Sequence, residues 1–217
     1  MNTIATLERH YGRLKPALAR GPFEMILYEN IAYLVSEDRR EKAFRELREH
    51  IGIRPEDILV ASLEELTAIT ALGGIFPELR ARRLQEAARL VRDEFHGDLK
   101  SVLALDFVQA RKALRKFPVI GDPGAEKILL FTGAHASLAL ESNGVRVLVR
   151  LGFAKEHKSY STTYRRLQQA LRDQIGSDCA ALVAAHRLLK LHGQELCRRS
   201  EPRCPACPLR KTCAFPR

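Results

Sequence analysis

Four cysteines crowd the C-terminal end of the chain and constrain its fold more than any other feature. They are Cys197, Cys204, Cys207 and Cys213, in the spacing Cys-x6-Cys-x2-Cys-x5-Cys. Zinc sites usually come as two separated Cys-x2-Cys pairs or include histidine, whereas four thiolates in one basic loop with a single close pair favour a cubane [4Fe–4S] cluster. Zinc and surface thiols without a metal are the alternatives. Disulfides are disfavoured because nothing in the sequence indicates secretion.

The remainder of the 217 residues carries apolar side chains at helical spacing. No segment has the pattern of a strand, and loops are short, so we expect an all-α protein of about ten helices. Ser62 and Glu65 form a capping box at the start of one of them. The spacing predicts helices over 23–34, 41–52, 62–72, 78–95, 101–117, 125–140, 142–153, 162–176 and 179–197.

The charge of the chain favours a polyanionic partner. Lys and Arg exceed Asp and Glu by 36 to 26, a net charge of +10. Residues 151–217 hold 13 of the basic residues and 5 of the acidic ones and so carry +8 of that charge. The alternative to nucleic-acid binding is that these charges only keep the protein in solution. No stretch approaches the ~20 apolar residues of a membrane helix, and the N-terminus has no apolar export segment, so we expect a cytoplasmic protein.

Two motifs together resemble a known family. The cysteine spacing after RLLKLHGQELC is similar to the cluster loop of the endonuclease III group of helix-hairpin-helix DNA glycosylases, and LRKFPVIGDPGAEKILLF at 114–131 is similar to their hairpin. The resemblance implies an all-α, two-domain helix-hairpin-helix fold. It implies a six-helix barrel domain at 21–136 with the hairpin at about 112–131, and a [4Fe–4S] cluster domain made of 1–20 and 137–217.

The hairpin is expected to bind a DNA phosphate through backbone N–H groups and a helix N-terminus. Gly121 and Gly124 would let the phosphate approach because neither carries a side chain. Val119 stands where the family has its first glycine, so an altered hairpin geometry is expected. A turn that only serves packing is the alternative interpretation.

The family's lysine nucleophile is absent. In bifunctional members a lysine two residues after the second hairpin glycine attacks the sugar, and here that position is Pro123. The resemblance therefore implies a monofunctional enzyme without lyase activity. Lys127, one helical turn further on, is expected to contact a phosphate or solvent rather than to reach inward.

The family's catalytic aspartate corresponds to a glutamate. Alignment through Arg146 puts Glu141 at that position and matches Asn143 to the asparagine of the adenine-removing relatives, so both Asn143 and Arg146 are candidate DNA contacts. Glu141 would stabilise the sugar cation, although its extra methylene moves the carboxylate oxygens. The alternative is a glutamate that only favours a helix N-terminus.

A second carboxylate, Glu29, falls where those adenine glycosylases carry the residue that protonates the base. Burial on an apolar helix face would raise its pKa and keep a proton available, which weakly favours a purine substrate. The alternative is a glutamate at a pocket rim, bonded to Asn30, Tyr28 or an arginine.

Two loops are expected to enter the DNA. Leu34 replaces the glutamine that fills the space of a flipped base in many relatives, and Ile75 or Phe76 is a candidate wedge. Arg80 and Arg83 are candidate phosphate contacts. Core packing is the alternative for the two apolar residues of the second loop, and a solvated face is the alternative for the arginines.

These features predict a DNA glycosylase of base-excision repair, cytoplasmic and associated with the nucleoid in a prokaryote, that acts as a monomer. Its partner would be double-stranded DNA with a damaged or mismatched base, which it flips out and releases by hydrolysis. A DNA-binding paralogue without catalysis is the first alternative. A bifunctional glycosylase and lyase with a displaced lysine is the second.

Overall fold

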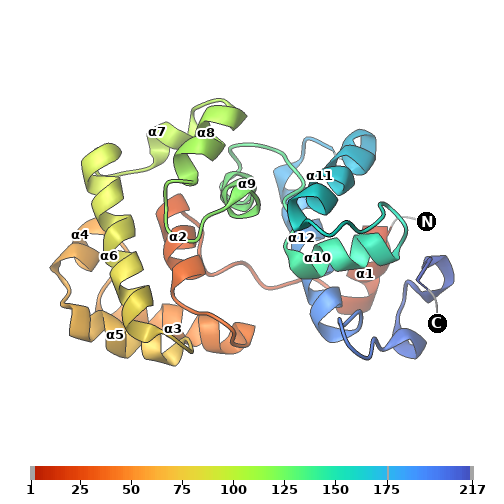
Figure 1. Ribbon diagram of the computed structural model, residues 1–217, viewed down its shortest axis with the longest axis horizontal. Helices are drawn as coiled ribbons and strands as arrows, with labels where there is room; N and C mark the ends of the chain where they lie inside the picture. The colour runs from red at the N-terminus through yellow and green to blue at the C-terminus, as the bar shows by residue number, and fades with distance from the viewer. Residues whose placement is uncertain (1–2, 175, 216–217) are drawn as a thin grey trace. The chain divides into compact units, whose positions relative to one another are not determined.

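The computed structural model describes residues 3–174 and 176–215, which form helices joined by loops (Figure 1). The prediction of an all-α protein is confirmed, because this part of the chain contains twelve α-helices and three short 3-10 helices but no strand. An isolated β-bridge joins Tyr33 and Gly74. None of the described helices has the length and apolar character needed to cross a membrane.

The chain divides into two compact units. The continuous unit is Ala17–Ala134, and the split unit combines Met1–Pro16 with His135–Arg217. The sequence suggested boundaries near 21 and 136 for the same kind of division. Each unit has its own helices and is described separately below.

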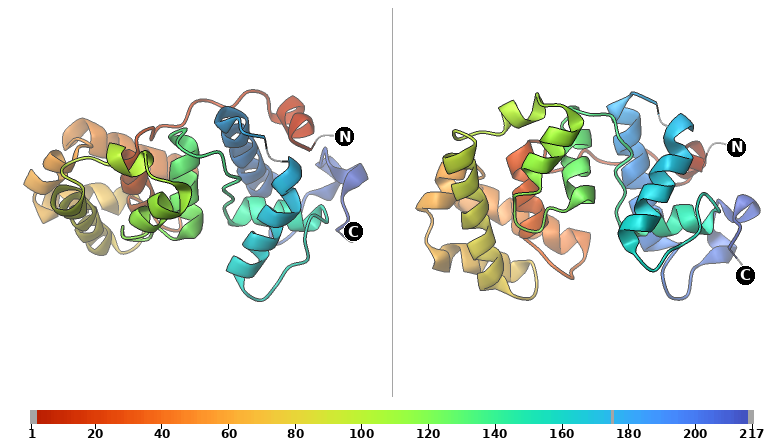
Figure 2. Two further views of the ribbon diagram at one scale, coloured as in Figure 1. Left: turned by 90° about the horizontal axis from the view of Figure 1, so that it is seen from above. Right: turned by 45° about the horizontal axis from the view of Figure 1, so that its top comes forward.

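The continuous unit is built around the long helix α6, which packs against α2, α4 and α5. Its core is aliphatic and aromatic, with Phe44, Leu84 and Ile128 fully buried. Helices α8 and α9 pack against each other and form a helical hairpin (Figures 1 and 2). The helices are α2 (Pro22–Asn30), α3 (Glu37–His50), α4 (Pro55–Val60), α5 (Leu63–Leu72), α6 (Pro77–Glu94), α7 (Lys100–Leu103), α8 (Phe107–Leu114) and α9 (Asp122–Phe131).

The split unit is organised around α12, which packs against both α1 and α10. Leu7 of α1 is fully buried there, although α1 is the first helix of the chain and α12 the last α-helix. The helices are α1 (Thr3–Tyr11), α10 (Ser142–Arg150), α11 (Tyr160–Leu171) and α12 (Cys179–Glu195), with 3-10 helices η1 (Arg172–Gln174), η2 (Cys204–Ala206) and η3 (Arg210–Thr212).

Two predicted helices are wrong in part. The helix expected over 101–117 is interrupted, because the Asp106 side chain accepts hydrogen bonds from the Val108 and Gln109 N–H groups and starts α8 anew. The helix expected over 125–140 ends at Phe131, where Gly133 adopts φ +74. Residues 134–140 form no regular secondary structure, and the buried Leu138, Ala139 and Leu140 contributed the apolar pattern that suggested a helix. Helices α1 and α4 were not predicted.

Candidate functional site

A pocket of about 490 Å³ lies in the continuous unit, beside the C-terminal end of α2 and the start of α6. The structure brings most of the polar and apolar candidates of this unit together around it. Asn30, Tyr33 and Arg40 also line it and were not predicted as functional residues. The full lining is Glu29, Asn30, Ala32, Tyr33, Arg40, Ile75, Phe76, Leu79, Arg80, Arg83 and Val119.

Glu29 is ion-paired at the pocket wall. Its Oε1 accepts a hydrogen bond from the Lys127 ammonium at 2.6 Å, and its Oε2 lies 4.0 Å from Arg40. Glu29 therefore lies between two cationic side chains, and the role of proton donor expected for it stays a prediction. The outward orientation expected for Lys127 is wrong, because its ammonium contacts Glu29 and lies 5.6 Å from the centre of the Phe131 ring.

Arg80 is a structural residue and not the expected phosphate contact. It is 2% exposed, and its guanidinium donates hydrogen bonds to the carbonyls of Ile31, Thr70, Gly74 and Ile75. These acceptors belong to the segment after α2, to the last turn of α5 and to the turn between α5 and α6. Arg80 therefore ties these two loops together from inside the protein.

The two loops and the hairpin turn each expose an apolar side chain on a left-handed backbone. Leu34 is 75% exposed at φ 55, Phe76 is 62% exposed at φ 55, and Val119 is 54% exposed at φ 58. Ile75 is 47% exposed, so core packing is wrong for both Ile75 and Phe76. Positive φ is rare for residues other than glycine, and such strain is concentrated at functional sites.

The hairpin turn keeps a glycine-like backbone without the glycine. Val119 adopts the left-handed conformation that the missing glycine would adopt without strain. The Asn30 amide fastens the turn by donating to the Pro118 carbonyl at 3.1 Å. A Cβ added at Gly121 would meet only Pro123 Cδ, at 3.9 Å, and one at Gly124 would meet Ile120 at ordinary distances. The fold itself therefore leaves open space at Gly121.

Glu141 caps helix α10 of the split unit. Its Oε1 accepts from the Gly144 N–H at 2.7 Å and its Oε2 accepts from the Asn143 amide at 2.8 Å. Asn143 Oδ1 in turn accepts from Arg146 at 2.6 Å. The alternative role foreseen for Glu141, at a helix N-terminus, is therefore present in the structure.

Arg146 supports the cysteine loop, and the DNA contact expected of it stays a prediction. Its guanidinium donates to the Cys197 carbonyl at 2.8 Å and to the Gly193 carbonyl at 2.7 Å. Burial lowers its pKa, the charge of Arg150 adds to that effect, and the charge of Cys197 opposes it. Helices α10 and α12 approach closely here, because a Cβ at Gly193 would lie 2.6 Å from the Asn143 Cβ.

The four cysteines of the C-terminal loop are half-buried and unpaired. Arg150 donates to the Cys197 sulfur at 3.4 Å, and His192 Nε2 lies 3.5 Å from the Cys207 sulfur. Burial raises the pKa of the Cys207 thiol, and the charges of the other three cysteines raise it further. Cys207 therefore lies near enough to each of the other three cysteines for their charges to act on it. Among the residues that the structure describes, no three His, Cys, Asp or Glu side chains are arranged to hold a single metal ion.

His192, which no sequence pattern singles out, contacts Cys207 of this loop. His192 is 1% exposed, and its Nδ1 lies 3.0 Å from the hydroxyl of Tyr11. Burial lowers the pKa of His192 to about 4, and the charge of His10 contributes. Burial also raises the pKa of Tyr11 to about 12, with a further contribution from Cys207. No spacing rule connects Tyr11 to a cysteine nearly two hundred residues later, so only the fold reveals this contact.

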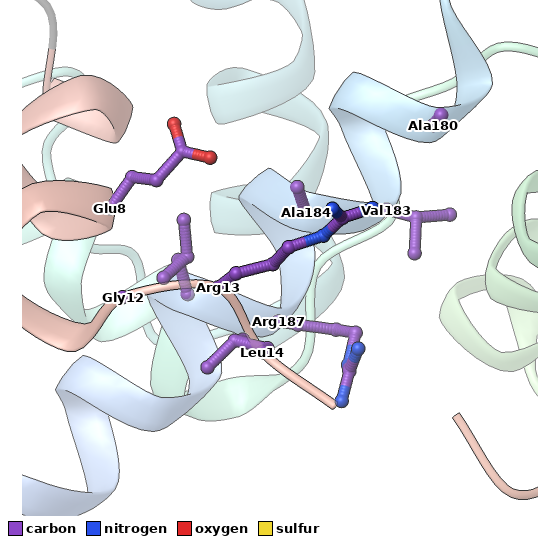
Figure 3. A pocket seen from close by; sticks show the side chains of 9 residues that line it. Glu8, Gly12, Arg13, Leu14, Ala180, Val183, Ala184 and Arg187 are labelled. Atoms are coloured by element: carbon purple, nitrogen blue, oxygen red, sulfur yellow. The ribbon is translucent and has the colours of Figure 1, made fainter. Parts of the chain in front are cut away.

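A second cavity, of about 460 Å³, lies in the split unit between the end of α1 and one face of α12 (Figure 3). Arg13 and Arg187 line it together with Glu8 and small apolar residues. No residue selected from the sequence lines this cavity.

Comparison with known proteins agrees with this geometry. No family model matches the chain. Endonuclease III of Sulfolobus acidocaldarius is 25% identical over 190 residues, which cover 85% of this chain and 80% of the relative. The thymine/uracil-DNA glycosylase of Pyrobaculum aerophilum is 26% identical over 162 residues, covering 74% and 66%. In sequence and in fold, this chain is similar to the endonuclease III-like helix-hairpin-helix DNA glycosylases.

Solved structures of the family share the fold. A non-covalent endonuclease III–DNA complex aligns with a TM-score of 0.77 at 22% identity, covering 97% of this chain and 91% of that one. A thermostable thymine-DNA glycosylase aligns with a TM-score of 0.76 at 17% identity, covering 98% and 94%.

The donor set of the C-terminal loop fits the iron–sulfur cluster of the endonuclease III family. Such a cluster needs four thiolates, and N–H groups directed at the sulfurs stabilise their negative charge. The loop supplies all four sulfurs unpaired, with Arg150 and His192 beside two of them. The residues present are therefore suited to this group.

Proposed function

We propose that this protein is a monofunctional DNA glycosylase that hydrolyses the N-glycosidic bond of a damaged or mismatched base in double-stranded DNA. The observation that carries the proposal is the pocket of the continuous unit, where Phe76 and Val119, two exposed apolar side chains on left-handed backbone, share the lining with Glu29, the partner of Lys127. Relatives named as endonuclease III and as a thymine/uracil-DNA glycosylase support it. The protein would act as a monomer on chromosomal DNA in the cytoplasm.

DNA binding begins at the two loops and the hairpin. Leu34 and Phe76 are exposed and apolar, as a wedge that opens a base stack must be. Arg83, half-buried on the pocket wall, is the remaining arginine of the second loop that can contact a phosphate. The open space at Gly121 would admit another phosphate at the N-terminus of α9. A flipped base would enter the cavity, whose volume is in the range of small-ligand sites.

The chemical step would divide between two carboxylates. Glu29, which lines the pocket, would donate a proton to the leaving purine as the N-glycosidic bond breaks, and the water that attacks the sugar would return a proton to this carboxylate, so that Lys127 stays an ammonium. Glu141, ionised and held by two hydrogen bonds, would stabilise positive charge on the sugar. Water would be the nucleophile, because Pro123 has no amine and an ammonium paired with a carboxylate has no lone pair to attack.

The cofactor would be a [4Fe–4S] cluster held by Cys197, Cys204, Cys207 and Cys213. It would fix a loop that has only short 3-10 helices of its own. Purified protein should be yellow-brown with broad absorption near ~400 nm, and Ala at any of the four positions should lower the soluble yield. Colourless protein with stoichiometric zinc would contradict this assignment.

A DNA-binding paralogue without catalysis is the second candidate, and one observation favours it. Both oxygens of Glu141 are already engaged as a helix cap, so this carboxylate has a structural role whether or not it acts on DNA. The two candidates differ in turnover and not in DNA affinity.

Base release from a panel of lesion duplexes under single-turnover conditions separates the candidates. Glu141→Gln should lower the rate at least ~10²-fold with DNA affinity preserved, because the lost charge acts mainly in the transition state. Glu29→Gln should slow release of an unmodified purine more than release of an N-alkylated purine, which already carries positive charge. If the wild type releases no base from any duplex of the panel, or if both variants release base at the wild-type rate, the non-catalytic DNA-binding paralogue is the better account.

Borohydride trapping on abasic-site DNA tests the monofunctional mechanism. We expect little covalent complex and little strand cleavage. Strong trapping that disappears in Lys127→Ala would instead identify Lys127 as a displaced Schiff-base nucleophile and the protein as a bifunctional lyase.

A further inference from the structure

We propose that His192 is a positioning residue for the cofactor. Its Nε2–H donates a hydrogen bond to the Cys207 thiolate, and Tyr11 fixes the orientation of the imidazole ring. This row of hydrogen bonds, from Tyr11 through His192 to Cys207, raises the reduction potential of the cluster. The inference rests on the proposed [4Fe–4S] cofactor. It concerns residues outside the four ligands and adds a contribution from the first helix of the chain.

Three segments far apart in sequence meet at this point. Tyr11 ends α1, His192 lies in the last turn of α12, and Cys207 follows η2. The hydroxyl of Tyr11 is 3.0 Å from His192 Nδ1, and His192 Nε2 is 3.5 Å from the Cys207 sulfur. The ring is 1% exposed, so water does not compete for either nitrogen.

The proton positions in this row of hydrogen bonds follow from the chemistry of its three groups. A metal-bound thiolate only accepts hydrogen bonds, so His192 must present its N–H at Nε2. A neutral imidazole has one N–H, so Nδ1 is then the acceptor, and the Tyr11 hydroxyl is the donor that faces it. The order is Tyr11 O–H to Nδ1, then Nε2–H to the sulfur. The opposite tautomer would lose the bond to Cys207.

The electrostatic consequence has a definite sign. Reduction adds negative charge to the cluster and its thiolates, and a hydrogen bond to a thiolate stabilises that charge. Removal of the His192 donor should therefore make reduction harder. Arg150 makes the comparable contact with Cys197, so this loop carries two such donors on different sulfurs.

The test is the one-electron reduction potential of the purified holoprotein, measured by spectroelectrochemistry after iron and acid-labile sulfide have been quantified. His192→Leu should lower the equilibrium constant for reduction of the cluster about tenfold. For a one-electron couple this is a fall in reduction potential of ~59 mV. His192→Gln can place an amide N–H near the position of Nε2 and should recover part of the shift. Tyr11→Phe should shift the potential in the same direction by less, because the ring stays but its orientation is no longer fixed.

A matched control is available on the same helix. His186 is 3% exposed, and its Nδ1 contacts the Ala139 carbonyl rather than a sulfur. His186→Leu should therefore leave the potential unchanged, although it places the same apolar group in the same helix.

The outcomes separate this inference from the proposed cofactor. Wild-type protein without iron and sulfide would overturn both. Loaded His192→Leu with a wild-type potential would overturn the role of His192 alone. If His192→Leu does not load, resonance Raman spectra decide, because hydrogen-bonded Fe–S stretching bands shift in D₂O. A D₂O-sensitive band that is unchanged in Tyr11→Phe and His192→Gln would overturn the inference.

Discussion

Two arginines three residues apart have opposite environments. Arg80 is buried and bonded to four carbonyls, whereas Arg83 is half-buried at the pocket wall. Both lie in the same basic stretch of α6, so composition alone treats them alike. Only the positions of the carbonyl acceptors distinguish them.

Replacing each arginine by methionine should distinguish a role in protein stability from a role in DNA binding. Arg80→Met leaves several buried carbonyls without a donor and should lower the free energy of unfolding by more than ~3 kcal/mol. Arg83→Met should change it by less than ~0.5 kcal/mol. It should instead reduce the salt dependence of DNA binding by about one phosphate contact. Urea unfolding and salt titrations measure both, and equal destabilisation by the two variants would contradict this assignment.

Val119 offers a test of stored backbone strain. Val119→Gly should raise the free energy of unfolding by about 0.5–1 kcal/mol, because relief of a left-handed valine exceeds the entropy cost of glycine. Val119→Ala keeps a Cβ at the same positive φ and should gain less. The urea midpoint at constant slope gives the difference. Destabilisation by glycine would argue that the valine side chain packs usefully in the turn.

The sequence was sufficient to select several residues of the pocket, but it did not predict which side chains they would contact. It identified Glu29, Phe76 and Val119 through the resemblance to the glycosylase family, and all three line the pocket. It misjudged Lys127, whose partner Glu29 is 98 positions away. Long side chains reach in several directions, and the choice among them depends on which carbonyl or carboxylate the fold brings near.

For the secondary-structure elements, local capping signals predicted helix starts correctly, whereas runs of apolar residues did not always predict a helix. The capping box is present, with the Glu65 N–H donating to Ser62 Oγ and the Ser62 N–H donating to Glu65. The end of the irregular stretch 134–140 is apolar because Leu138, Ala139 and Leu140 are buried, and a short buried apolar run does not by itself distinguish a helix from an irregular segment.

The hairpin can be tested through its glycine. Gly121→Val should weaken binding to all duplexes alike by about tenfold or more, the value of a lost hydrogen bond to a charged group. Stability should hardly change, because the N-cap φ of −87° suits valine and the added atoms meet open space. Band-shift assays and urea unfolding report the two effects.

Gly73→Ala is the matched control for that experiment. A Cβ there would collide with the Ile31 carbonyl and the Arg80 guanidinium. This variant should therefore lose stability, and a loss of stability in Gly121→Val of the same size would contradict the phosphate-binding interpretation.

For the whole molecule, the uneven charge predicts binding that is weakly sequence-dependent and strongly salt-dependent. The chain carries +10 overall, most of it in residues 151–217. If about four phosphates are neutralised, log K should fall with a slope of roughly −3.6 against log salt concentration. Titration of a fluorescent duplex between low and moderate salt measures this slope. Affinity that does not change with salt would contradict nucleic-acid binding.

The packing of α1 on α12 imposes an order on biosynthesis. The ribosome completes the continuous unit while the partner of α1 is still untranslated, since α12 begins only at Cys179. At about 5–20 residues per second, the apolar face of α1 waits roughly 10–30 s for that partner. During this interval Leu7 is exposed on the nascent chain, where a chaperone can bind it. The last cysteines leave the ribosome later still, so the cysteine loop assembles only after both α1 and α12 have been synthesised.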